Sequence, residues 1–326
     1  MSTLELITLQ HKIDFAVVLR VKHANPNGDP LNGNRPRTDY NGSGEISDVC
    51  LKRKMRDRLM EKGQNIFVQS DDRKVDGMRS LRERAEHDKF GLGKQAFALA
   101  AKKAKKPKKG AVDEEAAKEA PGELAQKDET ITAACAKWFD VRAFGNLFAW
   151  KAGEGKKKED SEDAESSDDS STSSVSIGIR GPVTVQSAFS LKPVDVTSTQ
   201  ITKSVNSEGD GSKRGTDTMG MKHRVDDAVY VFYGSMNPQL AERTGFSDAD
   251  AEAIKAVLPK LFENDASSAR PEGSMEVLKV LWWKQPKPGK YSSAKVHASL
   301  KMNEDGNGGY TITPLAGLSP EEKDGF

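Results

Sequence analysis

Residues 13–22 place apolar side chains at every second position, which is the pattern of a strand with one buried face. These positions are Ile13, Phe15, Val17, Leu19 and Val21. A second strand is predicted where Val183, Val185, Phe189 and Leu191 share one parity. The apolar runs 228–233 and 275–283 predict a third and a fourth strand.

Residues 47–61 follow the helical period instead. At 100° per residue, Leu51, Met55 and Leu59 form one stripe, so an amphipathic helix is predicted with this stripe against a core. Ser47 is a good N-cap, and Lys62 with Gly63 marks the end of the helix. A second helix is predicted after Phe246, beginning with a Ser-x-x-Asp capping box.

The remaining segments are predicted as connections. The range 23–44 reads as a long loop because it is rich in Gly and Pro, and 138–145 reads as a short strand and turn. Residues 197–224 read as a long hairpin with a Gly-rich tip. Residues 102–130 are of low complexity and predict an exposed helix or disorder, and residues 151–174 predict a solvated loop.

The order strand, helix, strand, strand, helix, strand predicts an α+β fold of the ferredoxin-like (RRM-like) kind. In that arrangement two helices cover one face of a four-stranded sheet. We expect the other face to be left for a ligand or for inserted subdomains.

Composition and charge limit the class of protein and the compartment in which we expect it. The chain has 326 residues, of which 36% are hydrophobic and 30% charged, and it lacks an apolar run long enough to span a bilayer. With two cysteines and no signal-peptide pattern at the N-terminus, we expect a reducing cytoplasm. The net charge is +1, yet residues 151–174 and the tail from Glu304 are both strongly acidic. The rest of the chain is therefore basic, which suits an anionic partner.

Several basic residues lie where they could meet a phosphate chain. Lys52, Arg53 and Arg56 occupy the side of the predicted helix beside its apolar stripe, where we expect them to be free; a solvated helix with snorkelling side chains is the alternative. Arg35 and Arg37 flank Pro36 in the preceding loop and could clamp phosphates. The neighbouring asparagines, Asn27, Asn32 and Asn34, are typical turn formers.

Two further motifs set an arginine beside glycine, which permits a close approach of a ligand backbone. They contain Arg142 (residues 140–145) and Arg180 (residues 178–182). The alternative is a bulge or turn whose arginine pairs with a nearby acid. At the end of the predicted hairpin, Met219 and Met221 stand beside Lys222, His223 and Arg224. Such a group suits a wedge between bases with phosphates clamped at its root, or else a hairpin packed against its own body.

Signals for an enzyme are weak. The five histidines lie at positions 11, 23, 87, 223 and 297, without metal-ligand spacing, so no metal site and no cofactor is predicted. Asp29 and Asp39 could hold a metal or activate water, but lone loop aspartates are usually turn residues.

Together these motifs resemble the Cas7 family of the RAMP superfamily, the backbone subunit of type I-C (Csd-type) CRISPR surveillance complexes (Cascade). The stretches that carry the resemblance are 25–30, 35–39, 46–57, 140–145, 180–183, 218–223 and 267–271. They span about residues 10–284 in the same order as in the family. The inserts 102–130 and 151–174 are not part of the pattern.

The resemblance implies a hand-shaped, non-catalytic RNA-binding subunit for CRISPR antiviral defence. Residues 10–62 and 175–300 would form the palm, 63–174 inserted helical fingers, 197–224 a thumb, and 301–326 a C-terminal tail. The residues expected to contact CRISPR RNA (crRNA) are Arg35, Arg37, Lys52, Arg53, Arg56, Arg142, Arg180, Met219, Met221, Lys222 and His223.

The same resemblance implies the partners. They are crRNA, target DNA through the guide, copies of the chain in a filament, other Cascade subunits and a recruited helicase-nuclease, with no membrane. Base pairing would read the target while the protein holds backbone and shape. Two alternatives stay open: a metal-dependent RNA endonuclease using Asp29 or Asp39, and a protein scaffold without nucleic acid.

Overall fold

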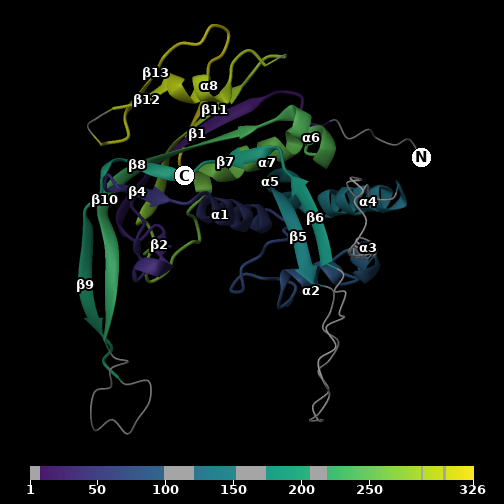
Figure 1. Cartoon of the computed structure of the whole chain (residues 1–326). Coiled ribbons are helices and arrows are strands. Elements are labelled where there is room, and N and C mark those ends of the chain that lie inside the picture. The colour runs from purple at the N-terminus through teal and green to yellow at the C-terminus, as the bar shows by residue number, and fades with distance from the viewer. Residues whose placement is uncertain (1–7, 99–120, 152–173, 206–218, 288, 304–305) are drawn as a thin grey trace, which may run out of the picture. The chain divides into compact units, whose positions relative to one another are not determined.

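The structure is a computed structural model that describes the chain except for residues 1–7, 99–120, 152–173, 206–218, 288 and 304–305 (Figure 1). The chain divides into two compact units, which are described separately. Among the described residues, the smaller unit comprises those of Gln64–Pro182 and Gln239–Phe246, and the larger comprises those of Ile7–Gly63, Val183–Pro238 and Ser247–Phe326. Among the helices of the described ranges, none has both the length and the hydropathy of a membrane span.

The chain is a mixed α/β protein. Its strands are β1 (Ile13–Ala24), β2 (Gly28–Asp29), β3 (Arg35–Pro36), β4 (Ser43–Ile46), β5 (Gly145–Lys151), β6 (Ser174–Arg180), β7 (Val183–Val185), β8 (Ala188–Pro193), β9 (Val196–Thr202), β10 (Met219–Met236), β11 (Met275–Lys284), β12 (Leu300–Met302), β13 (Tyr310–Ile312) and β14 (Glu321–Asp324). Its α-helices are α1 (Asp48–Glu61), α2 (Leu81–Glu86), α3 (Lys94–Ala98), α4 (Pro121–Lys137), α5 (Phe139–Phe144), α6 (Pro238–Thr244), α7 (Asp248–Val257) and α8 (Ser293–Ser299).

A large antiparallel sheet forms the larger unit. Its strand order is β14-β11-β1-β10-β8-β4, and β7 and β9 also pair with β10. Strand β1 lies at the centre and pairs with β10 on one side and β11 on the other. Val17 of β1 is opposite both Phe232 of β10 and Val280 of β11. The predicted first, third and fourth strands are confirmed by β1, β10 and β11.

Both faces of this sheet are covered. Figure 1 shows α1 and α7 on one side and α8 with β12 and β13 on the other. Ala16 and Val18 of β1 belong to the buried cluster that also contains Val296 of α8 and Leu300 of β12. The second face was expected to be left for a ligand or for inserted subdomains, and the structure instead covers it with the C-terminal part of the chain. Because Ala16 and Val18 are apolar as well, both faces of β1 must be buried, and residues 291–318 of the chain cover the second one.

The last residues of the chain add a strand to the edge of the sheet. β14 pairs with β11, and the carboxylates of Glu321 and Asp324 pair with Lys255 and Lys279. Phe326 then lies against the ammonium group of Lys260, 3.6 Å from its ring centroid. The acidic tail is thus docked because β11 and the region of α7 present lysines at that edge of the sheet.

The two predicted helices of the larger unit are confirmed. The Ser47 hydroxyl caps α1, and the helix ends at Glu61 with Gly63 at φ 81° just beyond it. Leu51, Met55 and Leu59 are fully buried, as their spacing predicts. α7 begins with the reciprocal capping box of Ser247 and Asp250.

Three local predictions were wrong. The range 138–145 forms helix α5 and not a strand, and β5 begins only at Gly145. The second strand is broken into β7 and β8, and after the break the parity reverses, so Ala188 is buried and Phe189 is 43% exposed. The range 23–44 is not wholly a loop, because β2 pairs with β3 and β4 starts at Ser43.

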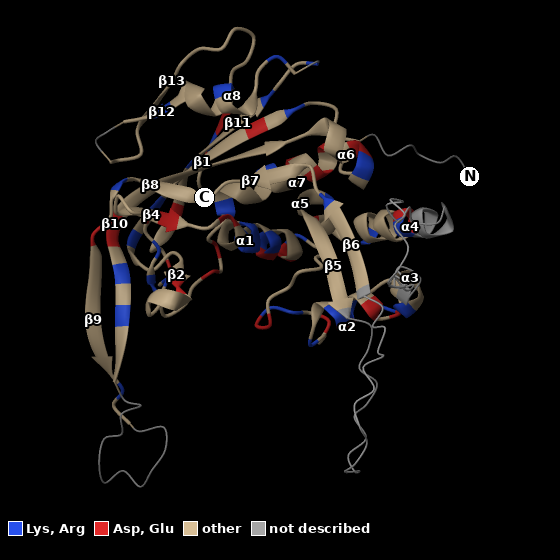
Figure 2. Cartoon of the chain, viewed as in Figure 1, with Lys and Arg blue, Asp and Glu red and all other residues tan. Residues whose placement is uncertain are grey.

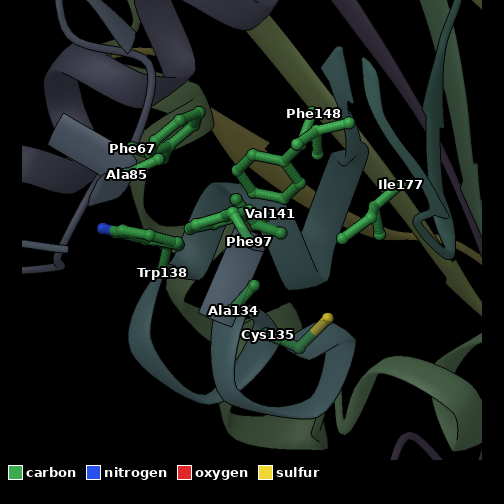
Figure 3. Close-up of a cluster of buried hydrophobic side chains, with 10 residues drawn as sticks. Phe67, Ala85, Phe97, Ala134, Cys135, Trp138, Val141, Phe148 and Ile177 are labelled. Atoms are coloured by element: carbon green, nitrogen blue, oxygen red, sulfur yellow. The ribbon is translucent and has the colours of Figure 1, made fainter. Parts of the chain in front are cut away.

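The smaller unit has its own aromatic core, shown in Figure 3. Phe67, Trp138 and Phe148 pack with ring centroids 4.7 to 6.2 Å apart, and α4 and the β5–β6 hairpin surround them. The buried carboxylate of Asp140 accepts hydrogen bonds from the backbone amides of Phe67 (2.7 Å) and Val68 (3.1 Å). Most of the low-complexity segment 102–130 and of 151–174 lies outside the described residues, but 121–137 is helix α4.

Both cysteines are free thiols. Burial raises the pKa of Cys135 to about 11 and also raises the pKa of Cys50. A thiol that stays protonated is a poor nucleophile and a poor metal ligand, so both cysteines act as small packing residues.

Candidate nucleic-acid interface

The loop before α1 is organised by its asparagines. The Asn27 Oδ1 accepts hydrogen bonds from the Ser47 amide (2.9 Å) and hydroxyl (2.8 Å), which ties the loop to the first turn of the helix. The Asn25 side chain donates to the carbonyl of Asn34 (2.7 Å), whose own φ is 59°. The turn-forming role predicted for Asn27 and Asn34 is confirmed.

The two arginines of this loop differ. Arg35 is exposed, and within the described part of the chain its guanidinium has no acidic partner. Arg37 is half-buried, with its Nη2 3.6 Å from Asp29 Oδ1. The structure therefore presents Arg35 for binding and uses Arg37 partly to brace the loop.

The loop aspartates are engaged in turns. Asp29 accepts a hydrogen bond from the Leu31 amide, and Asp39 accepts from the amides of Asn41 (2.9 Å) and Ser43 (2.8 Å). Across the described ranges, no group of three or more His, Cys, Asp or Glu side chains could hold a metal ion. Nothing in the loop brings Asp29 and Asp39 together as metal ligands.

The basic side chains of α1 are less free than their spacing suggested. Lys52 Nζ lies 3.0 Å from Asp48, and Arg53 lies 3.9 Å from Asp57, in both cases one helical turn away. The expectation that they are free was wrong, because acids occupy the i±4 positions. The solvent-accessible pair of Lys52 and Asp48 contributes only about 0.3–0.5 kcal/mol, so a phosphate can compete for Lys52. Asp57, the partner of Arg53, is buried. Arg56 is half-buried on the same helix.

A deeper ion-pair network holds α1 to the segment after α7. Lys54, whose side chain is 7% exposed, pairs with Asp265, and Arg270 Nε donates to the same carboxylate at 3.1 Å. Arg58 is also buried and pairs with Glu61 at 2.8 Å. Sequence reasoning gave Lys54 and Arg270 no role, because Asp265 is more than 200 residues from Lys54.

The predicted hairpin is confirmed by β9 and the first part of β10. Met219 pairs with Thr202 and Val225 with Val196, and the tip (206–218) lies outside the described residues. The two methionines are exposed (62% and 55%) and share one face with His223, which hydrogen-bonds with Ser198 at 2.8 Å. Lys222 lies on the opposite face, exposed and without an acidic partner among the described residues. Strand alternation thus places the methionines and Lys222 on opposite faces of the hairpin.

The root of this hairpin is anchored by charge. Asp226 receives the Thr197 hydroxyl at 2.7 Å and lies near Arg224 (3.3 Å) and His23 (3.8 Å). The Thr197 hydrogen bond is the main cause that lowers the pKa of Asp226, with the charge of Arg224 adding to it. Arg20 forms a bidentate pair with Asp227 at 2.9 and 2.5 Å. These contacts hold the hairpin where it leaves the sheet.

Arg142 and Arg180 belong to the smaller unit. The Arg142 guanidinium lies over the Phe139 ring at 4.8 Å and donates to the Cys135 carbonyl at 3.4 Å. Arg180 ends β6, exposed and with no acid beside it in the described ranges.

The glycines beside these arginines have a structural role. A Cβ on Gly145 would lie 2.2 Å from the Ile179 carbonyl oxygen, and one on Gly181 would lie 2.3 Å from that of Ala143. The close approach predicted for a ligand backbone is thus made here by the chain's own backbone, where β5 and β6 meet.

The comparisons with known proteins agree with one another. A family model described as CRISPR-associated protein Cas7 matches residues 11–314. The chain belongs to the Cas7 family. A Cas7 protein of Haloferax volcanii is 28% identical over 264 residues, covering 80% of this chain and 67% of that protein.

Two solved structures are also similar to this Cas7-family chain. A CRISPR RNA-guided surveillance complex in a pre-nicking state has a chain that matches with a TM-score of 0.43 and 16% identity, over 87% of this chain and 79% of that one. A second CRISPR RNA-guided surveillance complex gives 0.42 and 14%, over 91% and 76%. Similarity at this level does not assign a fold, so the family assignment rests on the sequence match.

Proposed function

We propose that this Cas7-family chain is the backbone subunit of a type I-C CRISPR surveillance complex, which oligomerises along crRNA and presents its bases for pairing with target DNA. The observation that carries the proposal is the family match over residues 11–314. It is supported by Arg35 and Lys222 of the larger unit, which are exposed and have no acidic partner among the residues that the structure describes.

The sheet of the larger unit supports the assignment of a ferredoxin-like palm. Along the chain the elements run β1, α1, β8, β10, α7, β11, and in the sheet β11, β1, β10 and β8 are neighbours in that order. We assign residues 10–62 and 175–300 to the palm, 197–224 to the thumb, 63–174 to the fingers and 301–326 to the C-terminal tail.

In this proposal the guide RNA lies over the loop before α1 and the exposed side of that helix. Arg35, Lys52, Arg53 and Arg56 contact phosphates, and Arg37 supports Arg35 from behind the loop. Arg142 and Arg180 contact the guide from the smaller unit. In the thumb, Met219, Met221 and His223 present the face that meets bases, while Lys222 meets backbone from the other face.

Phosphate contacts of this kind carry no sequence information, so the protein holds the guide and base pairing selects the target. Copies of the chain, other subunits of the complex and a recruited helicase-nuclease complete the assembly. The endonuclease alternative has no observation in its favour, because Asp29 and Asp39 already bond backbone amides of their own turns.

The test compares Arg35→Glu/Lys222→Glu with the charge-matched control Lys89→Glu/Lys94→Glu, at two exposed residues of the smaller unit. We expect the affinity for single-stranded RNA to fall by about tenfold, or about 1.4 kcal/mol. The slope of log affinity against log salt should become shallower by about 1.4, because two phosphate contacts are lost. The measurement is fluorescence anisotropy over a salt series.

The control should bind as the unmodified chain does. If the double variant keeps both the affinity and the slope, these two residues do not hold the guide. If the purified chain carries no RNA yet assembles into filaments, the scaffold alternative replaces the proposal.

A further inference from the structure

We propose that the larger unit carries a second nucleic-acid-binding surface, on the side of the sheet that faces away from α1. This α8 surface consists of Lys12, Lys287, Lys290 and Lys295 around Tyr291. It would take the phosphodiester backbone of a strand other than the guide. Figure 2 shows basic residues in α8 and in the loop that precedes it, across the sheet from α1.

Three of these lysines converge on one tyrosine. Lys12 Nζ donates to the Tyr291 carbonyl oxygen at 3.1 Å. Lys290 and Lys295 place their ammonium groups 5.5 and 5.2 Å from the centre of the Tyr291 ring. The two ammonium groups therefore lie within about 11 Å of each other. The Debye length is about 30 Å at 0.01 M salt and about 8 Å at physiological salt, so any repulsion between them is strongest at low ionic strength.

The loop that carries the lysines is held in shape from below. Gln285 is fully buried, and its Oε1 accepts from the amides of Lys290 (3.0 Å) and Tyr291 (2.9 Å). Its Nε2 donates to Asp14 (2.8 Å) and to the Tyr291 carbonyl (3.0 Å). The ammonium groups are thus presented by a fixed backbone.

No carboxylate neutralises this surface within the described ranges. Residues 284–303 contain no Asp or Glu, and none of the four lysines forms an ion pair with a described residue. The nearby Asp14 is fully buried and bonded to Gln285. Lys295 also lies in the first turn of α8, the end of a helix where a positive charge is unfavourable. Within the described ranges these lysines contact carbonyl groups and an aromatic ring but no carboxylate, which points to an external anion.

The chemistry favours a nucleic-acid backbone over other anions. Lysine is a hydrated point charge on a flexible stem, which suits contacts with successive phosphates and gives no sequence preference. The surface has no exposed large apolar side chain among its described residues that would anchor an acidic protein. Since the sheet separates it from α1, a strand bound here need not displace one bound there.

The test uses the complete assembly loaded with RNA, so that the guide surface is occupied. Its probes are labelled duplex DNA, single-stranded DNA and single-stranded RNA of about 30 nucleotides, a length that offers many phosphates to each copy. We expect Lys290→Glu/Lys295→Glu to weaken at least one of these about tenfold and to flatten its salt dependence, while the amount of RNA that copurifies is unchanged. The probe that loses most identifies the strand.

Lys89→Glu/Lys94→Glu is the charge-matched control, and Lys290→Gln/Lys295→Gln tests neutralisation without reversal. Thermal unfolding confirms that each variant is folded. If all three probes bind the variant as tightly as the unmodified assembly, or if only an acidic peptide distinguishes the two, the inference is wrong. A loss of copurified RNA would instead place these lysines in the guide site. Failure of the guide proposal appears separately, in the Arg35→Glu/Lys222→Glu variant.

Discussion

The two sides of the large sheet carry basic residues in opposite ways. On α1, Lys52, Lys54 and Arg58 each have a carboxylate partner within the larger unit. On the α8 surface the lysines bond backbone carbonyls or lie over a tyrosine ring, with no described carboxylate beside them. The basic helix that stands out in the sequence is therefore the more neutralised of the two surfaces.

This difference shows that a run of basic residues in the sequence does not tell how many of those side chains are free to bind an anionic ligand. Asp48 and Asp57 lie one turn from Lys52 and Arg53, so they reduce the local field of α1. At the α8 surface four lysines come from two distant segments, and none of them forms an ion pair with an acid in the part of the chain that the structure describes. Each of the following predictions tests one side of this comparison.

The largest effect is expected from removing the acid under α1. Asp265→Ala would leave Lys54 buried without its partner and deprive Arg270 of the same carboxylate. We expect the free energy of unfolding to fall by about 3 kcal/mol, as when one member of a buried ion pair is removed. The measurement is urea-induced unfolding followed by circular dichroism.

The matched control is Asp324→Ala, whose partner Lys279 holds an 83% exposed carboxylate at the sheet edge. That change should cost at most about 1 kcal/mol. Equal losses from the two variants would mean that Lys54 is not buried as described.

A smaller effect is expected from pH on the α8 side. His297 stacks on Tyr233 and lies 3.7 Å from Asp14 and 3.2 Å from the Gly234 carbonyl oxygen. Burial lowers the His297 pKa below 6.5, with Asp14 opposing the shift and Lys12 adding to it. The unfolded chain then binds a proton more readily than the folded one, so stability should fall as the pH drops below 6.5.

The measurement compares urea midpoints at about pH 7.5 and about pH 5.5 for the unmodified chain and for His297→Gln. The variant should lose less stability across this interval, because the remaining loss comes only from other groups. An identical loss in both proteins would contradict a buried neutral histidine.

The smallest expected effect is the change in the free energy of unfolding when one lysine is replaced, and its sign should differ between α1 and the α8 surface. Lys52→Gln should lower the free energy of unfolding by about 0.3–0.5 kcal/mol, because the pair with Asp48 is lost. Lys295→Glu should raise it by about 0.3–1 kcal/mol, because it relieves repulsion and places an acid in the first turn of α8.

Thermal unfolding at low and high salt gives the measurement, since both effects should shrink when charges are screened. A stabilised Lys295→Glu chain that no longer binds DNA would show that Lys295 is kept for a ligand. Destabilisation by Lys295→Glu would indicate an acidic partner that the described residues do not include.

Much of the larger unit could be predicted from local patterns. The alternation in β1, the Ser47 cap and the stripe of Leu51, Met55 and Leu59 are local features, and all are confirmed. Residues 138–145 failed because a short apolar run fits either a strand or a buried helix. The parity of β7 and β8 failed because an interruption in a strand changes register without a sequence signal in the flanking residues.

The residues of the candidate sites also divide into those that local sequence patterns predict and those that only the fold brings together. Arg35 and the exposed methionines were found from sequence, because turn chemistry and hairpin alternation are short-range. The covering of the second sheet face and the cluster around Tyr291 were not, because they join residues such as Lys12 and Lys290 from opposite ends of the chain.

The sequence by itself determined the central strands, the capped basic helix and the hairpin, since each depends on periodicity or spacing within a few tens of residues. It also indicated the family, through motifs that resemble those of Cas7 proteins in the same order along the chain. Only the tertiary structure decided which charges remain available. Whether a lysine meets a carboxylate depends on which segments the sheet brings together, and the pairs Lys54–Asp265 and Lys12–Tyr291 each join segments separated by more than 200 residues.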